Sequence, residues 1–195
     1  NSLKKKNRDA VMSAVFLHED SMQRNFEAEM ARYVGYEKAI LCQSGWAANV
    51  GLMQVIADKD TNIYIDFFAH MSLWEGVKSS GAKAIPFRHN SANSLENLIK
   101  KNGSGIIVVD SVYSTLGDIS PLKDIASLAA RYGCVLVVDE SHSLGTHGPM
   151  GSGLVAELGI TDQVHFITAS LAKTFASRAG IVLCSKSLGD WFPYV

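Results

Sequence analysis

Short apolar runs alternate with segments of helical periodicity along the chain. In the first helical segment, Met22, Phe26, Met30 and Tyr33 recur at the spacing of one helix face. Similar patterns predict helices over 21–34, 47–57, 71–79, 94–101, 121–132 and 154–158. The apolar runs predict strands over 39–43, 62–67, 83–87, 105–110, 134–139, 164–168 and 180–184.

The strands at 105–110 and 134–139 are continuously apolar, which is typical of strands covered on both faces. Alternation of strands and helices predicts a mostly parallel sheet sandwiched by helices, with ligands at the carboxyl ends of the strands. No repeat or proline-rich linker divides the chain. We therefore expect a single α/β domain over 1–195 with a seven-stranded sheet.

Composition excludes several classes of partner. The chain has 195 residues, of which 47% are hydrophobic and 19% charged, as in globular proteins. A net charge of −1 gives no electrostatic reason to expect nucleic acid or an anionic membrane. Cys42, Cys134 and Cys184 are far apart in apolar surroundings. They indicate buried thiols in a reducing cytoplasm, and neither a disulfide framework nor a metal site.

One lysine follows a predicted buried strand. The strand at 164–168 leads to Ser170 and then to Lys173. A lysine that is desolvated there loses part of its preference for the charged form and becomes a candidate for Schiff-base chemistry. Asp139 ends the preceding strand, and an acid at that place is the partner that the ring nitrogen of pyridoxal phosphate (PLP) requires. The pair suggests PLP chemistry.

Further polar residues follow other strands. Ser44, Gly45 and Trp46 form a small turn into a helix, whose N-terminus favours an anion such as phosphate, although an ordinary strand–helix turn fits the same residues. His70 follows the second strand and could stack on a planar ring or be a simple polar residue. His142 comes three residues after Asp139. Under the predicted topology these side chains share one edge of the sheet.

Other chemistries require elements that this sequence does not contain. The 139–142 segment mimics the strand of helicase-type ATPases, which need a G-x-x-x-x-G-K-[ST] phosphate loop. Ser170 and Lys173 match the S-x-x-K pattern of penicillin-recognising enzymes, which also need S-D-N and K-T-G. A nicotinamide site needs G-x-G-x-x-G after the first strand. A purely structural α/β module leaves the grouped polar residues unexplained.

Several segments resemble a known family. From 25 to 183 the chain is similar to fold-type I PLP enzymes and, within them, to the α-oxoamine synthases. The segment at 139–145 (DESHSLG) is the most specific. The segments at 41–46 (LCQSGW) and 171–175 (LAKTF) most closely resemble the quorum-sensing synthases that make α-aminoketone or α-hydroxyketone autoinducer precursors.

The resemblance implies four catalytic roles. Lys173 corresponds to the lysine that forms the Schiff base with PLP and moves the α-proton of the substrate. Asp139 corresponds to the partner of the pyridinium nitrogen, and His70 to the histidine stacked on the ring. His142 corresponds to a residue near the phenolic oxygen of the ring.

The resemblance also implies further cofactor-binding residues. The N–H groups of Gly45 and Trp46, with Ser44 and the hydroxyl of Ser170, correspond to the phosphate cradle. Ser114 corresponds to a residue near the phenolic oxygen. The family is expected to act as a cytoplasmic homodimer with the active site at the subunit interface. The resemblance also implies an N-terminal arm and a C-terminal small domain, which we expect to be absent from these 195 residues, so that 1–195 corresponds to the PLP-binding large domain.

The implied reaction is a PLP-dependent, decarboxylative condensation of an acyl-CoA with a small amino acid, or with S-adenosylmethionine, to an α-aminoketone. Residues 174–180 (TFASRAG) replace a run that is rich in glycine in the family, which leaves the substrate open. The alternatives are another fold-type I PLP enzyme, such as an aminotransferase or a lyase, and a non-catalytic α/β binding domain.

Overall fold

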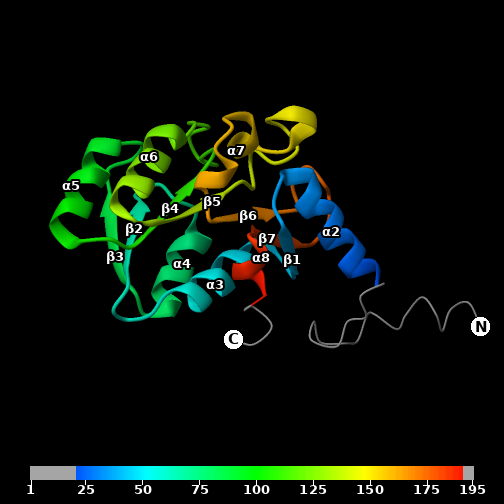
Figure 1. Ribbon diagram of the computed structural model, residues 1–195, viewed down its shortest axis with the longest axis horizontal. Helices are drawn as coiled ribbons and strands as arrows, with labels where there is room; N and C mark the ends of the chain where they lie inside the picture. The colour runs from blue at the N-terminus through cyan, green and yellow to red at the C-terminus, as the bar shows by residue number, and fades with distance from the viewer. Residues whose placement is uncertain (1–20, 191–195) are drawn as a thin grey trace, which may run out of the picture.

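The computed structural model describes residues 21–190, and the ends of the predicted domain, 1–20 and 191–195, lie outside the described residues. Within them the chain forms one seven-stranded sheet between helices, in the order β1-β7-β6-β5-β4-β2-β3 (Figure 1). The strands are β1 Lys38–Cys42, β2 Asn62–Asp66, β3 Lys83–Phe87, β4 Ile106–Asp110, β5 Val135–Asp139, β6 Phe166–Ser170 and β7 Gly180–Cys184.

Six strands of the sheet run in the same direction. β3, β2, β4, β5 and β6 pair in parallel, whereas β7 is antiparallel to β6 on one side and to β1 on the other. The predicted α/β class with a mostly parallel, seven-stranded sheet is therefore confirmed. The reversed direction of β7 places its first residue, Gly180, at the edge where β6 ends.

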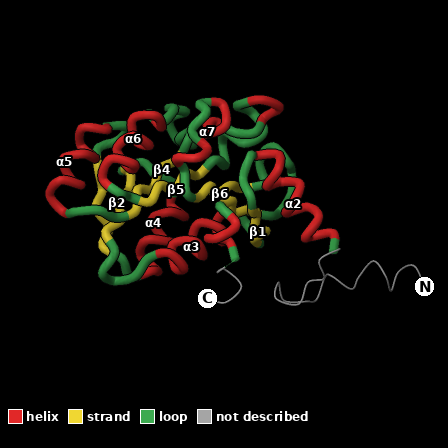
Figure 2. The backbone as a smooth tube through the Cα atoms, viewed as in Figure 1, coloured by secondary structure: helices red, strands yellow, loops and turns green. Residues whose placement is uncertain are grey.

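Helices cover both faces of the sheet (Figures 1 and 2). α3 and α4 pack on one face, and α2, α5, α6 and α7 pack on the other. The helices are α2 Met22–Val34, α3 Gly45–Ile56, α4 Met71–Ser80, α5 Ala92–Asn102, α6 Leu122–Tyr132, α7 Leu154–Glu157 and α8 Lys186–Gly189. Three-residue 3₁₀ helices lie at Pro149–Gly151 and Thr161–Gln163. No helix between residues 21 and 190 is long and apolar enough to cross a membrane.

β4 shows how the apolar pattern fixes the layers. Ile106 and Val108 belong to the core under α3 and α4, while Ile107 and Val109 belong to the core under α5 and α6. Successive side chains of a strand point to opposite faces, so an unbroken apolar run fills both layers. Each fully buried aliphatic side chain contributes roughly 1.5–3 kcal/mol. The sheet is consequently a stable base for residues at its carboxyl edge.

β6 is the strand whose position was predicted least accurately, because it begins two residues later than the apolar run at 164–168 suggested. Val164 ends the 3₁₀ helix Thr161–Gln163, and the strand then continues to Ser170. Ser170 is in register with Gly180 of β7. The strand therefore delivers Ser170 directly to the edge of the sheet.

Candidate active site

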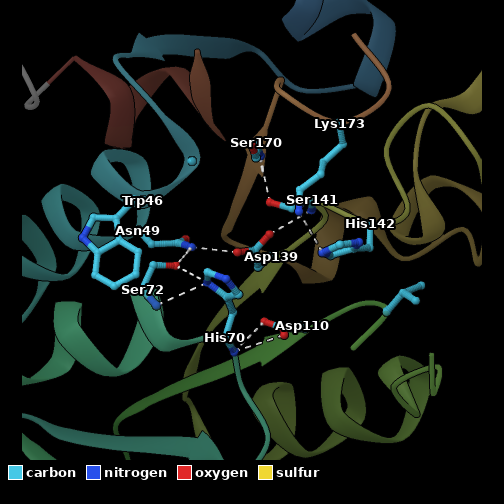
Figure 3. A pocket seen from close by; sticks show the side chains of 12 residues that line it. Trp46, Asn49, His70, Ser72, Asp110, Asp139, Ser141, His142, Ser170 and Lys173 are labelled. Carbon is cyan, nitrogen blue, oxygen red and sulfur yellow. Dashed lines mark hydrogen bonds between the residues drawn. The ribbon is translucent and has the colours of Figure 1, made fainter. Parts of the chain in front are cut away.

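A pocket opens at the carboxyl edge of the sheet (Figure 3). It is open to solvent, holds about 440 Å³ of space including part of that solvent, and is bounded by the ends of β4, β5 and β6 and by the first turns of α3 and α4. Its lining residues are Gly45, Trp46, Asn49, His70, Ser72, Asp110, Val112, Asp139, Ser141, His142, Ser170 and Lys173.

Most of the predicted site residues come together here, and two do not. Ser44 lies just outside the lining as the N-cap of α3, where its Oγ accepts a hydrogen bond from the Ala47 N–H at 3.0 Å. Ser114 is exposed in the loop after β4 and does not line the pocket. The remaining predicted residues that line it are Gly45, Trp46, His70, Asp139, His142, Ser170 and Lys173.

Asp139 is held rigidly. It is the last residue of β5, and only 4% of it is exposed. Its Oδ1 accepts the Ser141 N–H at 2.8 Å, and its Oδ2 accepts a hydrogen from Asn49 Nδ2 at 2.7 Å. Hydrogen bonds to a carboxylate of this kind stabilise its charged form. The pocket thus presents an oriented acidic group.

A second carboxyl group lies beside the first, because β4 and β5 are in register at Asp110 and Asp139. Burial, and next the charge of Asp139, raise the pKa of Asp110 well above its usual range. The Asp110 carboxyl nevertheless accepts the backbone N–H of His70 at 3.1 Å. Asp110 therefore ties the segment that delivers His70 to the edge of the sheet.

Lys173 and His142 are neighbours, with 3.3 Å between Nζ and Nε2. Burial of the half-buried ring, and next the Lys173 charge, lower the pKa of His142. Lys173 itself is exposed, so the prediction of a desolvated lysine is wrong for this structure. It lies in the loop 171–179, in which only Leu171 is buried.

The first turn of α3 packs closely against the end of β6. A Cβ atom added to Gly45 would lie 2.6 Å from Ser170 Cβ, so this position requires glycine. The Ser170 N–H donates to Ser141 Oγ at 2.7 Å. Because the first N–H groups of a helix lack partners within it, this end of α3 favours an anion. Trp46 is 49% exposed and contacts the His70 ring edge-on, at 6.2 Å between ring centroids.

Four polar lining residues had no role assigned from the sequence: Asn49, Ser72, Asp110 and Ser141. Asn49 lies one turn after Gly45, on the same face of α3. Ser72 and Ser141 each follow a predicted site residue by two positions. For these three, proximity in sequence to Gly45, His70 and Asp139 was the available signal, whereas Asp110 ends the predicted strand at 105–110.

Comparison with known proteins places the chain in a family. The sequence model of the family "Aminotransferase class I and II" matches residues 2–192. The CAI-1 autoinducer synthase of Vibrio campbellii is 59% identical over 187 residues, which are 96% of this chain and 48% of that protein. The chain belongs to the aminotransferase class I and II family. The predicted resemblance to α-oxoamine synthases, and to the autoinducer synthases among them, is confirmed.

Solved structures support the same placement. Serine palmitoyltransferase of Sphingomonas wittichii superposes with a TM-score of 0.88 at 26% identity, covering 98% of this chain and 51% of that one. A variant of the S. paucimobilis enzyme with a bound PLP–myriocin aldimine gives 0.87 at 27% identity, with the same coverage. The chain spans about half the length of the relatives it matches.

Proposed function

We propose that this chain forms the PLP-binding part of an α-oxoamine synthase that condenses an acyl-CoA with an amino acid. One observation carries the proposal: a single pocket unites the Lys173 amine, the Asp139 carboxylate, the His70 ring and the N-terminus of α3. These groups come from different elements that the sheet brings to one edge. We infer the class of enzyme from the family, and the roles of the individual residues from their positions in the pocket.

The donor set fits PLP group by group. The cofactor has a phosphate for the end of α3 and Ser170, a ring nitrogen for Asp139, a ring face for His70 and an aldehyde for Lys173. Two acids at the ends of β4 and β5 differ in their surroundings: Asp139 accepts hydrogen bonds from two donors, the Ser141 N–H and the Asn49 amide, whereas both bonds to Asp110 come from the His70 N–H. When bound, PLP supplies a carbonyl that condenses with amines and a ring that accepts electrons.

The residues of the chain then have defined tasks. Asp139 holds a proton at the ring nitrogen, and His70 covers one ring face and excludes water from it. With PLP bound, Lys173 would supply the amine that holds the cofactor's aldehyde carbon, and it would take up the proton that leaves the substrate α-carbon. His142, 3.3 Å from the Lys173 amine, orients that amine.

For the substrates, we propose a medium-chain acyl-CoA and a small unbranched amino acid or S-adenosylmethionine. The reaction joins the amino acid α-carbon to the acyl carbon and releases CoA and CO₂, leaving an α-aminoketone. The support is the 59% identity to a CAI-1 autoinducer synthase over 96% of the chain.

We further propose a cytoplasmic homodimer with the active site at the interface. Apolar side chains near the pocket support a covered surface: Trp46 is 49%, Phe68 45%, Phe67 64% and Met71 66% exposed. The three free cysteines agree with a reducing compartment. Sedimentation of the protein at several concentrations tests the assembly, and a monomer at all of them contradicts it.

The test of the function combines a visible spectrum with an assay of CoA release. The full-length protein with PLP should absorb in the visible range, change its spectrum with the correct amino acid, and release CoA only when an acyl-CoA is added. Amino-group transfer to a keto acid without CoA release would establish an aminotransferase instead. A colourless protein that PLP does not change would establish a non-catalytic domain.

Preference for one acyl chain length is a separate question. We expect the highest rate of CoA release with medium-chain acyl-CoA. A clear preference for succinyl-CoA with glycine, or for pimeloyl-CoA with alanine, would overturn the substrate assignment and leave the enzyme class intact.

A further inference from the structure

A chain of hydrogen bonds runs through the pocket from Asp139 to His70 (Figure 3). The Asn49 side-chain amide donates to Asp139 Oδ2 at 2.7 Å and to Ser72 Oγ at 2.8 Å. The Ser72 hydroxyl lies 2.7 Å from Nδ1 of His70. Asn49 is 2% and Ser72 1% exposed, so bulk water does not compete for these bonds.

The direction of each bond can be assigned. The Ser72 backbone N–H points at His70 Nδ1 from 3.2 Å, so Nδ1 must carry a lone pair. The Ser72 hydroxyl accepts from Asn49 and therefore donates its own proton to the same nitrogen. Asn49 must present its nitrogen to Asp139, because its carbonyl oxygen would repel a carboxylate at 2.7 Å. The proton of a neutral His70 ring consequently lies on Nε2.

Helix capping explains only some of the hydrogen bonds between Asp139 and His70. His70 is the N-cap of α4, and the bond from the Ser72 N–H to Nδ1 is the one that the cap requires. The bonds of Asn49 serve no helix end, since Ser44 already caps α3. They join α3, α4 and β5. The two groups at the ends of this series of hydrogen bonds, Asp139 and His70, both line the pocket.

We propose that Asn49 and Ser72 are positioning residues, which hold His70 with its proton on Nε2 and hold Asp139 Oδ2 in place. This inference rests on the proposed function, in which these two groups meet the face and the nitrogen of one cofactor ring. With Nε2 already protonated, a further proton on Nδ1 would make the His70 ring cationic beside a protonated ring nitrogen. Two donors are already aimed at Nδ1, so this nitrogen has no free lone pair for a proton.

The first test needs no cofactor. The full chain, labelled with ¹⁵N-histidine, is studied by long-range ¹H–¹⁵N NMR, and the His70 signals are assigned by their loss in His70→Asn. We expect the wild-type ring to show only the Nε2–H tautomer. In Ser72→Ala the Nδ1 signal should move towards that of a nitrogen free of hydrogen bonds, whereas Ser79→Ala, on the exposed part of the same helix, leaves it unchanged.

The second test measures PLP affinity by absorbance titration. Ser72→Ala and Asn49→Ala should each raise the Kd roughly tenfold, the effect of one lost hydrogen bond. If the connected hydrogen bonds act as a unit, the Kd of the double variant should be little higher than that of either single variant. Asn93→Ala, on the exposed face of α5, should leave the Kd unchanged.

The outcomes distinguish failure of the positioning role of Asn49 and Ser72 from failure of the proposed function. An Nδ1–H tautomer or a mixture in the wild type would overturn the inference, and this requires no variant to fold. Effects on Kd that multiply in the double variant would show two independent contacts and also overturn it. If the wild type binds no PLP, the proposed function fails and with it the role towards the cofactor, while the spectrum still decides the tautomer.

Discussion

The ends of β5 and β6 are neighbours in the sheet, and they differ in how they hold their reactive groups. Asp139 and Glu140, at the end of β5, are 4% and 0% exposed and accept backbone N–H groups. Lys173, after β6, lies in a loop whose side chains are exposed from Ala172 to Arg178. The acid is part of the core, and the amine is not.

The loop after β6 is shaped by backbone hydrogen bonds within it, such as that from the Ser177 N–H to the Leu171 carbonyl at 2.9 Å, while most of its side chains are exposed. Phe175 contacts Tyr33 edge-on at 6.3 Å between ring centroids, and Thr174 packs so closely on Gly145 that a Cβ there would lie 2.4 Å away. Ala176 has φ 48°, a left-handed conformation that costs a residue with a Cβ about 1–2 kcal/mol. The electrostatics of the pocket are thus fixed by folding, whereas the position of the amine depends on a surface loop.

The largest expected effect is that of Lys173→Ala, which changes the loop and leaves the core intact. The rate of CoA release should fall roughly 10²- to 10⁴-fold, the range for loss of a proton-transfer group. The free energy of unfolding should change by less than about 0.5 kcal/mol, as for exposed positions generally. Rate assays and urea unfolding measure the two effects, with exposed Lys59→Ala as the control.

Covalent labelling tests directly whether Lys173 is the lysine that reacts with PLP. Borohydride reduction of the protein with PLP, followed by peptide mapping, should place the pyridoxyl group on the peptide that contains Lys173. Label on any other lysine would contradict the assignment of the amine.

Asp139→Asn tests the core side of the comparison. An amide cannot stabilise a pyridinium charge, so PLP binding should weaken by about 1.5–3 kcal/mol, with a larger loss of turnover. Titration with PLP and the assay of CoA release measure the two losses. The matched control is Asp162→Asn, at an exposed position. Turnover at the wild-type rate would make Asp139 a purely structural residue.

The raised pKa of Glu140 predicts that the free energy of unfolding depends on pH. Burial raises the pKa of Glu140 from 4.5 to about 7. Because the folded-state value is the higher one, the stabilising effect of the bound proton is complete below pH 4.5 and is lost as the pH rises through about 7. Glu140→Gln should remove up to roughly 3 kcal/mol of this decline.

Urea unfolding at pH 5 and pH 8 measures that decline. The comparison uses the difference between the two pH values, because a buried glutamine amide also changes stability at both. Glu75→Gln, at an exposed site, should keep the wild-type pH dependence. An equal decline in Glu140→Gln and in the wild type would show that other groups cause it.

The smallest effect concerns the contact between the two regions. The Lys173 charge is the second cause, after burial, of the lowered pKa of His142. In Lys173→Met the pKa of His142 should rise and stay below its usual value, because burial remains. NMR titration of the His142 ring measures the change, with Lys78→Met as the control. An unchanged pKa would mean that the loop holds the amine away from the ring in solution.

Much of the fold could be predicted from the sequence because its strands are marked by strong local signals. β4 and β5 are apolar throughout and end at Asp110 and Asp139, so their limits differ from the prediction by one residue. The reversed direction of β7 could not be predicted, since it depends on pairing with β1 and β6 rather than on its own residues. α8 was also missed because Lys186–Gly189 is a single short turn.

The candidate site divides in the same way. Residues at or shortly after the ends of strands, such as Asp139, Ser170 and His70, could be grouped because parallel strands share a carboxyl edge. Asn49 and Ser72 were missed, because their bonds cross between helices and leave no local pattern. The exposure of Lys173 also depends on which segments cover the loop, which an apolar run before it does not determine.

The pairing of Ser170 with Gly180 has a consequence for the kinetics of the amine. The loop 171–179 is closed at both ends by hydrogen-bonded strands, so Lys173 is a tethered reactant that can explore only a small volume above the pocket. A short tether of this kind gives an effective concentration in the millimolar range or above, in addition to the contact of the amine with His142. Return of the lysine after each turnover is then an intramolecular event, faster than capture of any amine that must diffuse in from solution.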